Sequence, residues 1–143
     1  MQDDRLIRRA TAARTTGNNL EAKLAALRRG QDAEAAVVRD LRARGWELLG
    51  LNVRVGRLEL DVVARDGDTV VVIEVRTRGP GSWQSGLESV ARAKGRRVRT
   101  AGELLWRHRF QRDPSVNRMR FDVAAVTFAP DGDARIEYAR GVL

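Results

Sequence analysis

The chain has 143 residues, of which 43% are hydrophobic, and this suits one domain with a real core. Its 27 Lys and Arg against 19 Asp and Glu give a net charge of +8, which favours a polyanionic partner or simply a solvated basic surface. The lack of Cys excludes disulfides and thiolate sites, the single His108 supports no catalytic triad, and no apolar run is long enough to span a membrane. With no recognisable signal peptide, we expect a cytoplasmic protein.

The first half of the chain predicts one helix and three strands. Residues 1–19 have no apolar period, so we expect a flexible basic tail before a domain that covers residues 20–143. A helical period runs from residue 20 to 44, with Gly30 as an interruption and Gly45 as the C-cap. Three strands are then predicted at residues 46–54, 57–65 and 69–78. The second alternates apolar and polar residues, and the third is rich in Val and Ile.

The second half predicts a helix and two strands. The helix is expected from about residue 85 to 109, and the strands at 119–128 and 134–140 flank a Pro130-Asp131-Gly132 turn. The order helix, three strands, helix, two strands predicts a single α/β domain, in which helices pack on a mixed sheet.

The second and third predicted strands carry the residues that suggest chemistry. Asp66-Gly67 between them predicts a two-residue hairpin turn, which sets Glu59 opposite Glu74, Asp61 opposite Val72 and Arg57 opposite Arg76. One face of this hairpin is then charged. The other is apolar and consists of Leu58, Leu60, Val62, Val71, Ile73 and Val75.

Like charges across a ladder are destabilising, and a divalent cation, a raised pKa or a neighbouring Arg would relieve them. Because Mg²⁺ prefers hard oxygen ligands, Asp61, Glu74 and the carbonyl of Val75 form a candidate metal site. The alternative is a solvated face whose acids pair with Arg57 and Arg76.

Two residues on the helices favour a polar pocket. Glu34 shares a helix face with Val38 and Leu41, which is an unusual place for a solvated acid. Lys94 lies within an apolar stripe of the second helix, where a Lys needs either a partner or a path to water.

With these residues the chain resembles the YraN-type family of uncharacterised bacterial proteins. Through that family it resembles the PD-(D/E)xK nucleases, particularly archaeal Holliday-junction resolvases. The resemblance covers roughly residues 30–143. Its motifs are Gly30-Gln31-Asp32-Ala33-Glu34-Ala35-Ala36, Asn52-Val53-Arg54, Glu59-Leu60-Asp61 with the hairpin that follows, Val72-Ile73-Glu74-Val75-Arg76, Lys94, and Arg120-Phe121-Asp122-Val123.

The resemblance implies a restriction-endonuclease-like domain that hydrolyses phosphodiesters with Mg²⁺ or Mn²⁺. It assigns Asp61 and Glu74 as metal ligands and Glu34 as the helical acid that helps to hold the hydrolytic water. The implied substrate is DNA, including branched DNA, and a homodimer would suit two symmetric cuts.

Two departures from the family pattern affect this assignment. Leu58 replaces a Gly, and Arg76 replaces the Lys of the Glu-x-Lys motif. Arg keeps the positive charge but cannot act as a base, so Lys94 is a candidate for that role. The second interpretation is therefore a nucleic-acid-binding module that cuts slowly or not at all, and the third is a protein–protein adaptor.

A basic helix face is the candidate contact surface for nucleic acid. Arg92, Arg96 and Arg99 recur with helical spacing away from Lys94, and Trp83 is a candidate for stacking on an unpaired base. The alternative for the arginines is an ordinary solvated face. Asp122 is either a further acid of the site or part of a structural ion pair.

Overall fold

The computed structural model describes the backbone of residues 20–78 and 87–143, and the side chains of residues 28–77 and 94–143. The expected tail, residues 1–19, lies outside the described residues. The observed elements are α1 (Leu20–Ala43), β1 (Glu47–Val55), β2 (Leu58–Asp66), β3 (Thr69–Arg78), α2 (Leu87–Leu105), the π-helical turn η2 (Trp106–Phe110), β4 (Arg118–Phe128) and β5 (Ala134–Ala139). The predicted order of helices and strands is confirmed, and η2 is the one addition among the described residues.

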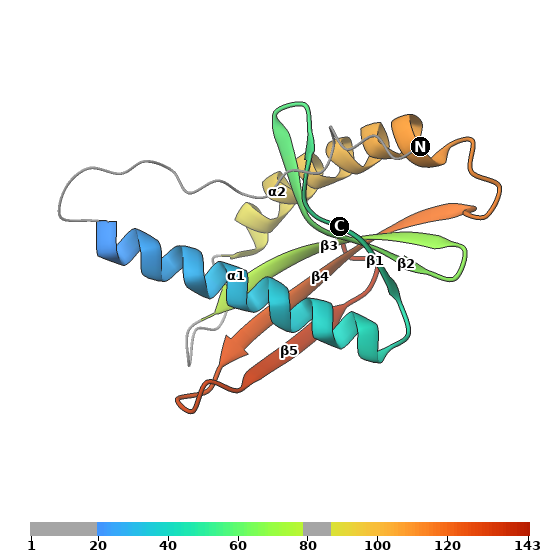
Figure 1. Ribbon diagram of the computed structural model, residues 1–143. Helices are drawn as coiled ribbons and strands as arrows, with labels where there is room; N and C mark the ends of the chain where they lie inside the picture. Colours follow the sequence, from blue (N-terminus) through green and yellow to red (C-terminus); the bar gives the residue numbers. More distant parts are fainter. Residues whose placement is uncertain (1–19, 79–86) are drawn as a thin grey trace.

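The five strands form one mixed sheet in the order β1-β2-β3-β4-β5. Strands β3 and β4 are parallel, and the other neighbours are antiparallel. The α2–η2 helix makes the crossover that a parallel pair requires. Figure 1 shows α1 crossing one face of the sheet and α2 lying on the other side, so the predicted α/β class with a mixed sheet flanked by helices is confirmed.

The first helix is continuous through Gly30, so the predicted interruption is wrong. A Gly costs a helix only about 1 kcal/mol relative to Ala, which good helix-forming neighbours such as Ala and Glu can offset. The predicted C-cap is confirmed. Gly45 has a φ of +82°, its N–H donates to the carbonyl of Arg42, and the N–H of Trp46 donates to that of Leu41.

The β2–β3 hairpin turns one residue later than predicted. Strand β2 ends at Asp66 and β3 begins at Thr69, so the turn residues are Gly67 and Asp68. Gly67 has a φ of +59°, which fits the turn type with Gly in the first central position rather than the second.

The pairing predicted for this hairpin is therefore wrong, because Val62 is opposite Ile73 and Asp66 is opposite Thr69. None of the three predicted pairs is observed: Glu59 with Glu74, Asp61 with Val72, and Arg57 with Arg76. The shift amounts to two residues, so the side chains keep their faces while Asp61 moves to the level of Glu74.

The in–out alternation of β1 and β2 reverses at Asn52 and Asp61. Before this point Leu51 and Val62 pack with the α1 side of the sheet, and beyond it Val53 and Leu60 pack with α2. Asn52 has a φ of +48°, a left-handed conformation that few residues other than Gly adopt. The predicted single apolar face is therefore wrong for Leu58 and Leu60, which lie on the α2 side. Figure 1 shows the end of the β1–β2 hairpin beside α2.

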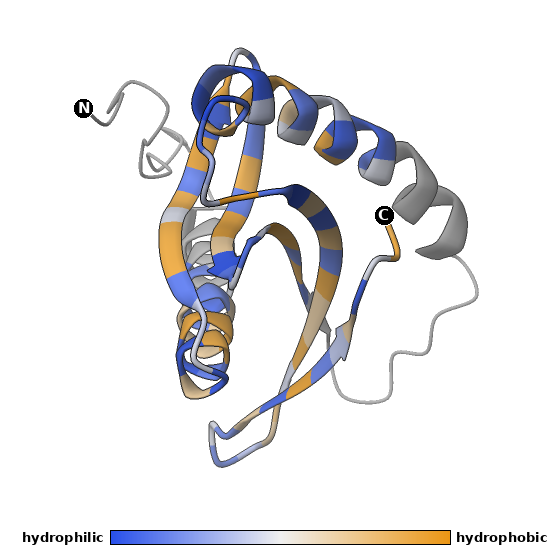
Figure 2. Ribbon diagram, turned by 90° about the vertical axis from the view of Figure 1, so that its right-hand side faces the viewer, coloured by the Kyte–Doolittle hydropathy of each residue, from blue (hydrophilic) through white to orange (hydrophobic). Residues whose placement is uncertain are grey.

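Both faces of the sheet bury apolar residues. The cluster on the α2 side includes Val63, Val72 and Leu105, and the cluster on the α1 side includes Leu41 and Ile73. Figure 2 shows hydrophobic and hydrophilic bands alternating along the strands. No helix within the described ranges is long and apolar enough to cross a membrane.

Candidate functional site

Asp61 lies where the β2–β3 ladder ends. The last paired residues are Val62 and Ile73. Beyond them the Asp61 carboxylate, instead of a backbone carbonyl of β2, accepts a hydrogen bond from β3. Its Oδ2 accepts a hydrogen bond of 2.9 Å from the backbone N–H of Val75. This bond fixes one oxygen of Asp61 against β3, next to Glu74, and the charges of the two acids interact.

Glu74 is almost completely buried, with 2% of its side chain exposed. Its Oε1 lies 2.5 Å from Nζ of Lys94, an ion pair whose angles fall outside those of a directed hydrogen bond. The Lys94 side chain is 51% exposed, so Lys94 combines this ion pair with access to water. Lys94 thus has the partner that its place in the apolar stripe required.

Glu34 reaches the same place from α1. It is half-buried, and its Oε2 accepts a hydrogen bond of 3.1 Å from Nδ2 of Asn52. By the β1–β2 register Asn52 stands opposite Asp61, since Leu51 pairs with Val62 and Val53 with Leu60. The reversal of the strands at Asn52 therefore brings an acid from α1 to the acids of β2 and β3.

Two acids of this cluster, Asp61 and Glu34, have raised pKa values. Burial is the main cause for Asp61, and with the adjacent charge of Glu74 it raises the pKa from 3.8 to about 7. Burial also raises the pKa of Glu34, against the hydrogen bond from Asn52, which lowers it. The cluster thus holds more negative charge than Lys94 and the hydrogen bonds stabilise, and a bound cation would relieve it.

The described residues contain no group of three or more His, Cys, Asp or Glu side chains placed to hold a metal ion. The donor set is smaller: the carboxylates of Asp61 and Glu74, with the adjacent carbonyl of Val75 as the candidate third ligand. Mg²⁺ usually takes one or two carboxylates and completes its shell with water or phosphate. The set and its uncompensated charge fit such an ion.

Glu59 and Arg76, both placed on the charged face by sequence, differ from these acids. Glu59 is exposed, and its Oε2 lies 3.9 Å from Nε of Arg54 on the neighbouring strand. Its charge nevertheless contributes to the raised pKa of Glu34. Arg76 is partly exposed on β3, and no hydrogen bond or ion pair joins it to another residue with a described side chain. Lys94, and not Arg76, is the cation in contact with Glu74.

The structure describes the side chains of only some of the predicted nucleic-acid-binding residues. Arg96 and Arg99 are exposed on α2, and the guanidinium of Arg99 lies 5.3 Å from the centroid of the Phe121 ring. The side chain of Arg92 and all of Trp83 lie outside the described residues.

Asp122 belongs to a separate structural cluster. It is fully buried, and it accepts hydrogen bonds from Arg120 Nε, Tyr138 Oη at 2.6 Å and the N–H of Gly141 at 2.8 Å. Of the two interpretations from sequence, the structural ion pair is the one observed.

Comparison with known proteins gives a consistent family. The model of the uncharacterised protein family UPF0102 matches residues 33–126. A UPF0102 protein of Sorangium cellulosum is 56% identical over 108 residues, which are 76% of this chain and 75% of that protein. A UPF0102 protein of Kineococcus radiotolerans is 43% identical over 116 residues, 79% of this chain and 91% of its own. One of Pseudomonas fluorescens is 37% identical over 111 residues, 78% and 89% of the two chains.

Proposed function

The chain belongs to the uncharacterised protein family UPF0102, the YraN-type family, and we propose that it is a metal-dependent nuclease that hydrolyses phosphodiesters in DNA. The observation that carries this proposal is the meeting of Asp61, Glu74 and Lys94 at the point where β2 and β3 separate. Hard oxygen ligands beside an exposed cation suit a phosphate group.

Asp61, Glu74 and the carbonyl of Val75 would hold Mg²⁺ or Mn²⁺. When bound, such an ion supplies Lewis-acid chemistry, which neutralises charge on the phosphate and makes water a stronger nucleophile. The N–H of Val75 holds Asp61 in place, so one carboxylate oxygen is fixed before substrate arrives. Asn52 orients Glu34, the candidate acid for holding the hydrolytic water, and burial raises the pKa of Glu34 above its usual value.

Lys94 provides the positive charge that the family pattern places at the position of Arg76. Its ammonium contacts Glu74 and its side chain is half exposed, so Lys94 can also meet a phosphate oxygen. Arg76 has no partner among the described side chains and remains available as a contact to the DNA backbone. The absence of Lys from the Glu-x-Lys motif is therefore compatible with catalysis.

The test is cleavage of duplex, single-stranded and four-way-junction DNA by the purified protein with and without Mg²⁺ or Mn²⁺. We expect Asp61→Ala and Glu74→Ala to lower the cleavage rate by about a hundredfold or more, the scale on which charge-stabilising groups act. Glu59→Ala is the comparison variant, because it removes an exposed carboxylate two positions from Asp61 that pairs with Arg54 and reaches Glu34 through its charge. Its rate should stay within about threefold of wild type.

The role of the two cations is tested in the same assay. Lys94→Gln should lower the rate by about ten- to a hundredfold, and Arg76→Gln by less, whereas Arg76→Lys should give no gain. A large gain with Arg76→Lys would show that the missing Lys limits catalysis. Salt-sensitive DNA binding without any metal-dependent cleavage, unchanged by Asp61→Ala, would instead identify a binding module on this scaffold.

A further inference from the structure

The positive charge of the chain is concentrated in one continuous segment. Between Lys94 and Arg120 there are nine Lys and Arg residues and only two acids, Glu103 and Asp113, so this segment carries +7 of the total of +8. It covers most of α2, the π-helical turn η2, the following loop and the start of β4. The rest of the chain is almost neutral, so an anionic partner would approach this side.

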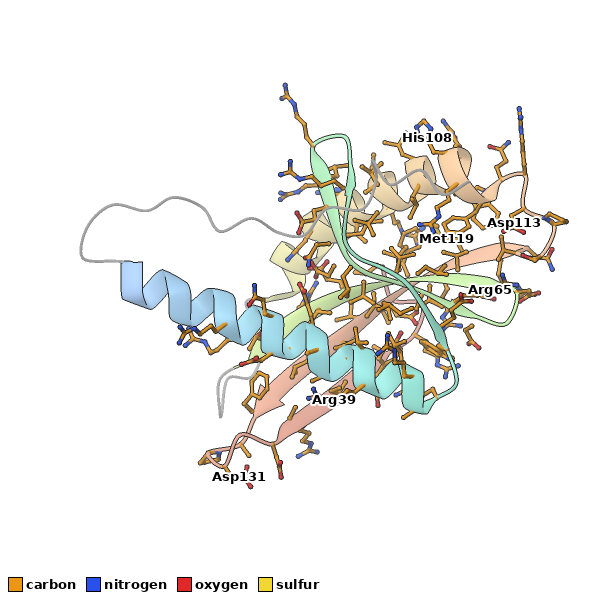
Figure 3. All side chains as sticks on the ribbon, in the orientation of Figure 1. Arg39, Arg65, His108, Asp113, Met119 and Asp131 are labelled. Carbon is orange, nitrogen blue, oxygen red and sulfur yellow. The ribbon has the colours of Figure 1, made fainter. Side chains whose placement is uncertain are left out.

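A pocket of about 360 Å³ opens in this segment, between the end of α2, η2 and the start of β4. Its lining residues come from both the helix and the strand: Glu103, Trp106 and Arg107 from the helix, with Asn117, Arg118, Met119 and Phe121 from the strand side. Figure 3 shows Met119 between the helix end and the sheet, and His108 on the outer side of the helix. None of these residues belongs to the site around Asp61.

The inner wall of the pocket is aromatic and apolar. Phe121 approaches α2 so closely that a Cβ on Gly102 would lie 2.4 Å from its ring, so only Gly fits there. Trp106 packs at its edge against the core, 6.2 Å from Phe110 between ring centroids. Met119 supplies a polarisable side chain beside them. Flat aromatic and thioether groups of this kind suit a planar ring.

The rim of the pocket is polar and mainly positive. Arg107 and Arg118 line it. The Arg118 side chain is 71% exposed, and its Nη2 lies 4.0 Å from Oδ2 of Asp68. Asn117 is held by Asp68, to which its Nδ2 donates at 3.1 Å, and Glu103 adds a carboxylate to the lining. A ligand with a flat ring, hydrogen-bonding edges and a phosphate would match each of these features. Pocket volumes from about 300 Å³ suffice for small ligands.

We propose that this pocket binds an unpaired nucleotide of a DNA strand, with the base beside Trp106 and Met119 and its phosphate on Arg107 and Arg118. The inference rests on the proposed function, because it names a part of the same DNA substrate. From Lys94 to Trp106 there are twelve residues, or about 18 Å of helix axis at 1.5 Å per residue. At about 3.4 Å per nucleotide, this separates the pocket from the Lys94 site by roughly five nucleotides.

The test is binding without divalent cations, so that no DNA is cut. Fluorescence anisotropy would compare a labelled 15-nucleotide single strand with the matching duplex and with a duplex that has one bulged nucleotide. We expect wild type to bind the single strand and the bulged duplex about tenfold more tightly than the plain duplex. A deoxynucleoside monophosphate added as competitor should act only at much higher concentration, since it lacks the neighbouring phosphates.

Three variants locate the binding. Trp106→Ala should weaken binding of unpaired DNA about tenfold, in line with the loss of one base stack, and leave the duplex almost unchanged. Arg118→Ala removes an exposed side chain with no role in the core, so it tests the pocket even if Trp106→Ala does not fold. Arg112→Ala is its matched control, because Arg112 is exposed in the same segment but does not line the pocket.

The pocket assignment is overturned if Arg118→Ala binds unpaired DNA as Arg112→Ala does, or if wild type does not prefer unpaired DNA. It is also overturned if the monophosphate competes as well as the oligonucleotide, because the pocket would then hold a free nucleotide. Conversion of a dimer to a monomer by Trp106→Ala would overturn it too, because the pocket would then hold a second copy of the chain. Each of these outcomes leaves metal-dependent cleavage through Asp61 intact. Absence of both DNA binding and cleavage would remove the proposed function as well.

Discussion

Two buried acidic regions of this protein solve the same problem in opposite ways. Asp122 on β4 has no exposed surface, and three groups of the chain donate hydrogen bonds to it: Arg120, Tyr138 and the N–H of Gly141. Asp61 on β2 accepts one hydrogen bond, from Val75, and lies beside the charge of Glu74. Two acids on neighbouring parts of one sheet therefore differ in how completely the protein itself satisfies them.

The difference separates a structural acid from the acid of the proposed metal site. Because all three donors belong to the protein itself, Asp122 links β4, β5 and the C-terminal residues permanently. Burial and the adjacent charge of Glu74 raise the pKa of Asp61 to about 7, and the hydrogen bond from Val75 offsets them only in part. A site that must bind and release an ion cannot be satisfied by the fold alone, and it lowers the stability of the folded protein in the absence of that ion.

The largest effect that sharpens the comparison is expected at Asp122. Asp122→Ala leaves Arg120 and Tyr138 without their main acceptor, and we expect a loss of about 3–5 kcal/mol in the free energy of unfolding, measured with urea. Cleavage per folded molecule should not change, because Asp122 does not touch the Asp61 site. A loss below about 1 kcal/mol would contradict the structural role.

At Asp61 a substitution is expected to raise the free energy of unfolding instead of lowering it. The folded protein keeps the Asp61 proton up to about pH 7, whereas the unfolded chain releases it near pH 3.8. Folding therefore takes up a proton between these pH values, and this group makes the free energy of unfolding fall as the pH rises, by at most about 4 kcal/mol.

Asp61→Asn removes this dependence, so without divalent cations it should be more stable than wild type at pH 8 and show a flatter profile from pH 4 to 7. Added Mg²⁺ should stabilise wild type and leave Asp61→Asn unaffected, as measured by thermal unfolding. If Mg²⁺ shifts both melting temperatures equally, Asp61 does not hold the ion.

The smallest effect concerns the hydroxyl of Tyr138. Tyr138→Phe keeps the ring on Trp46 but removes one donor to Asp122, and we expect a loss of about 2 kcal/mol in urea unfolding. Burial and the hydrogen bond to Asp122 raise the pKa of this phenol above its usual 10.0. Tyr138 is the only Tyr, so phenolate absorbance reports on it alone. Ionisation of the folded protein near pH 10 would argue against the buried hydrogen bond.

Much of the fold could be predicted from the sequence, because the relevant signals are local. Short-range patterns predict the strands β2 and β3, the C-capping Gly45 and the order of the elements. The turn after Asp66 could be placed only to within one residue, because a Gly with positive φ fits either central position of a two-residue turn.

The site was less accessible from sequence because it depends on packing. Asp61, Glu74 and Lys94 were singled out and do meet, although by a different register from the predicted one. The reversal at Asn52 was not predicted: its left-handed backbone coincides with the point where β1 changes from packing with α1 to packing with α2. Trp106 was not distinguished from a core residue either, because only the parallel crossover brings Met119 and Phe121 beside it.

The segregation of charge along α2 and η2 also bears on how fast the protein finds its partner. With +7 in the segment from Lys94 to Arg120 and about +1 in all the rest, the molecule has a strong electric dipole. A phosphate chain would turn that side toward itself before contact, and such steering can raise association rates by about ten- to a thousandfold at low ionic strength. Screening within about 8 Å at physiological salt would remove most of this advantage, so orientation at encounter depends on the ionic strength of the medium.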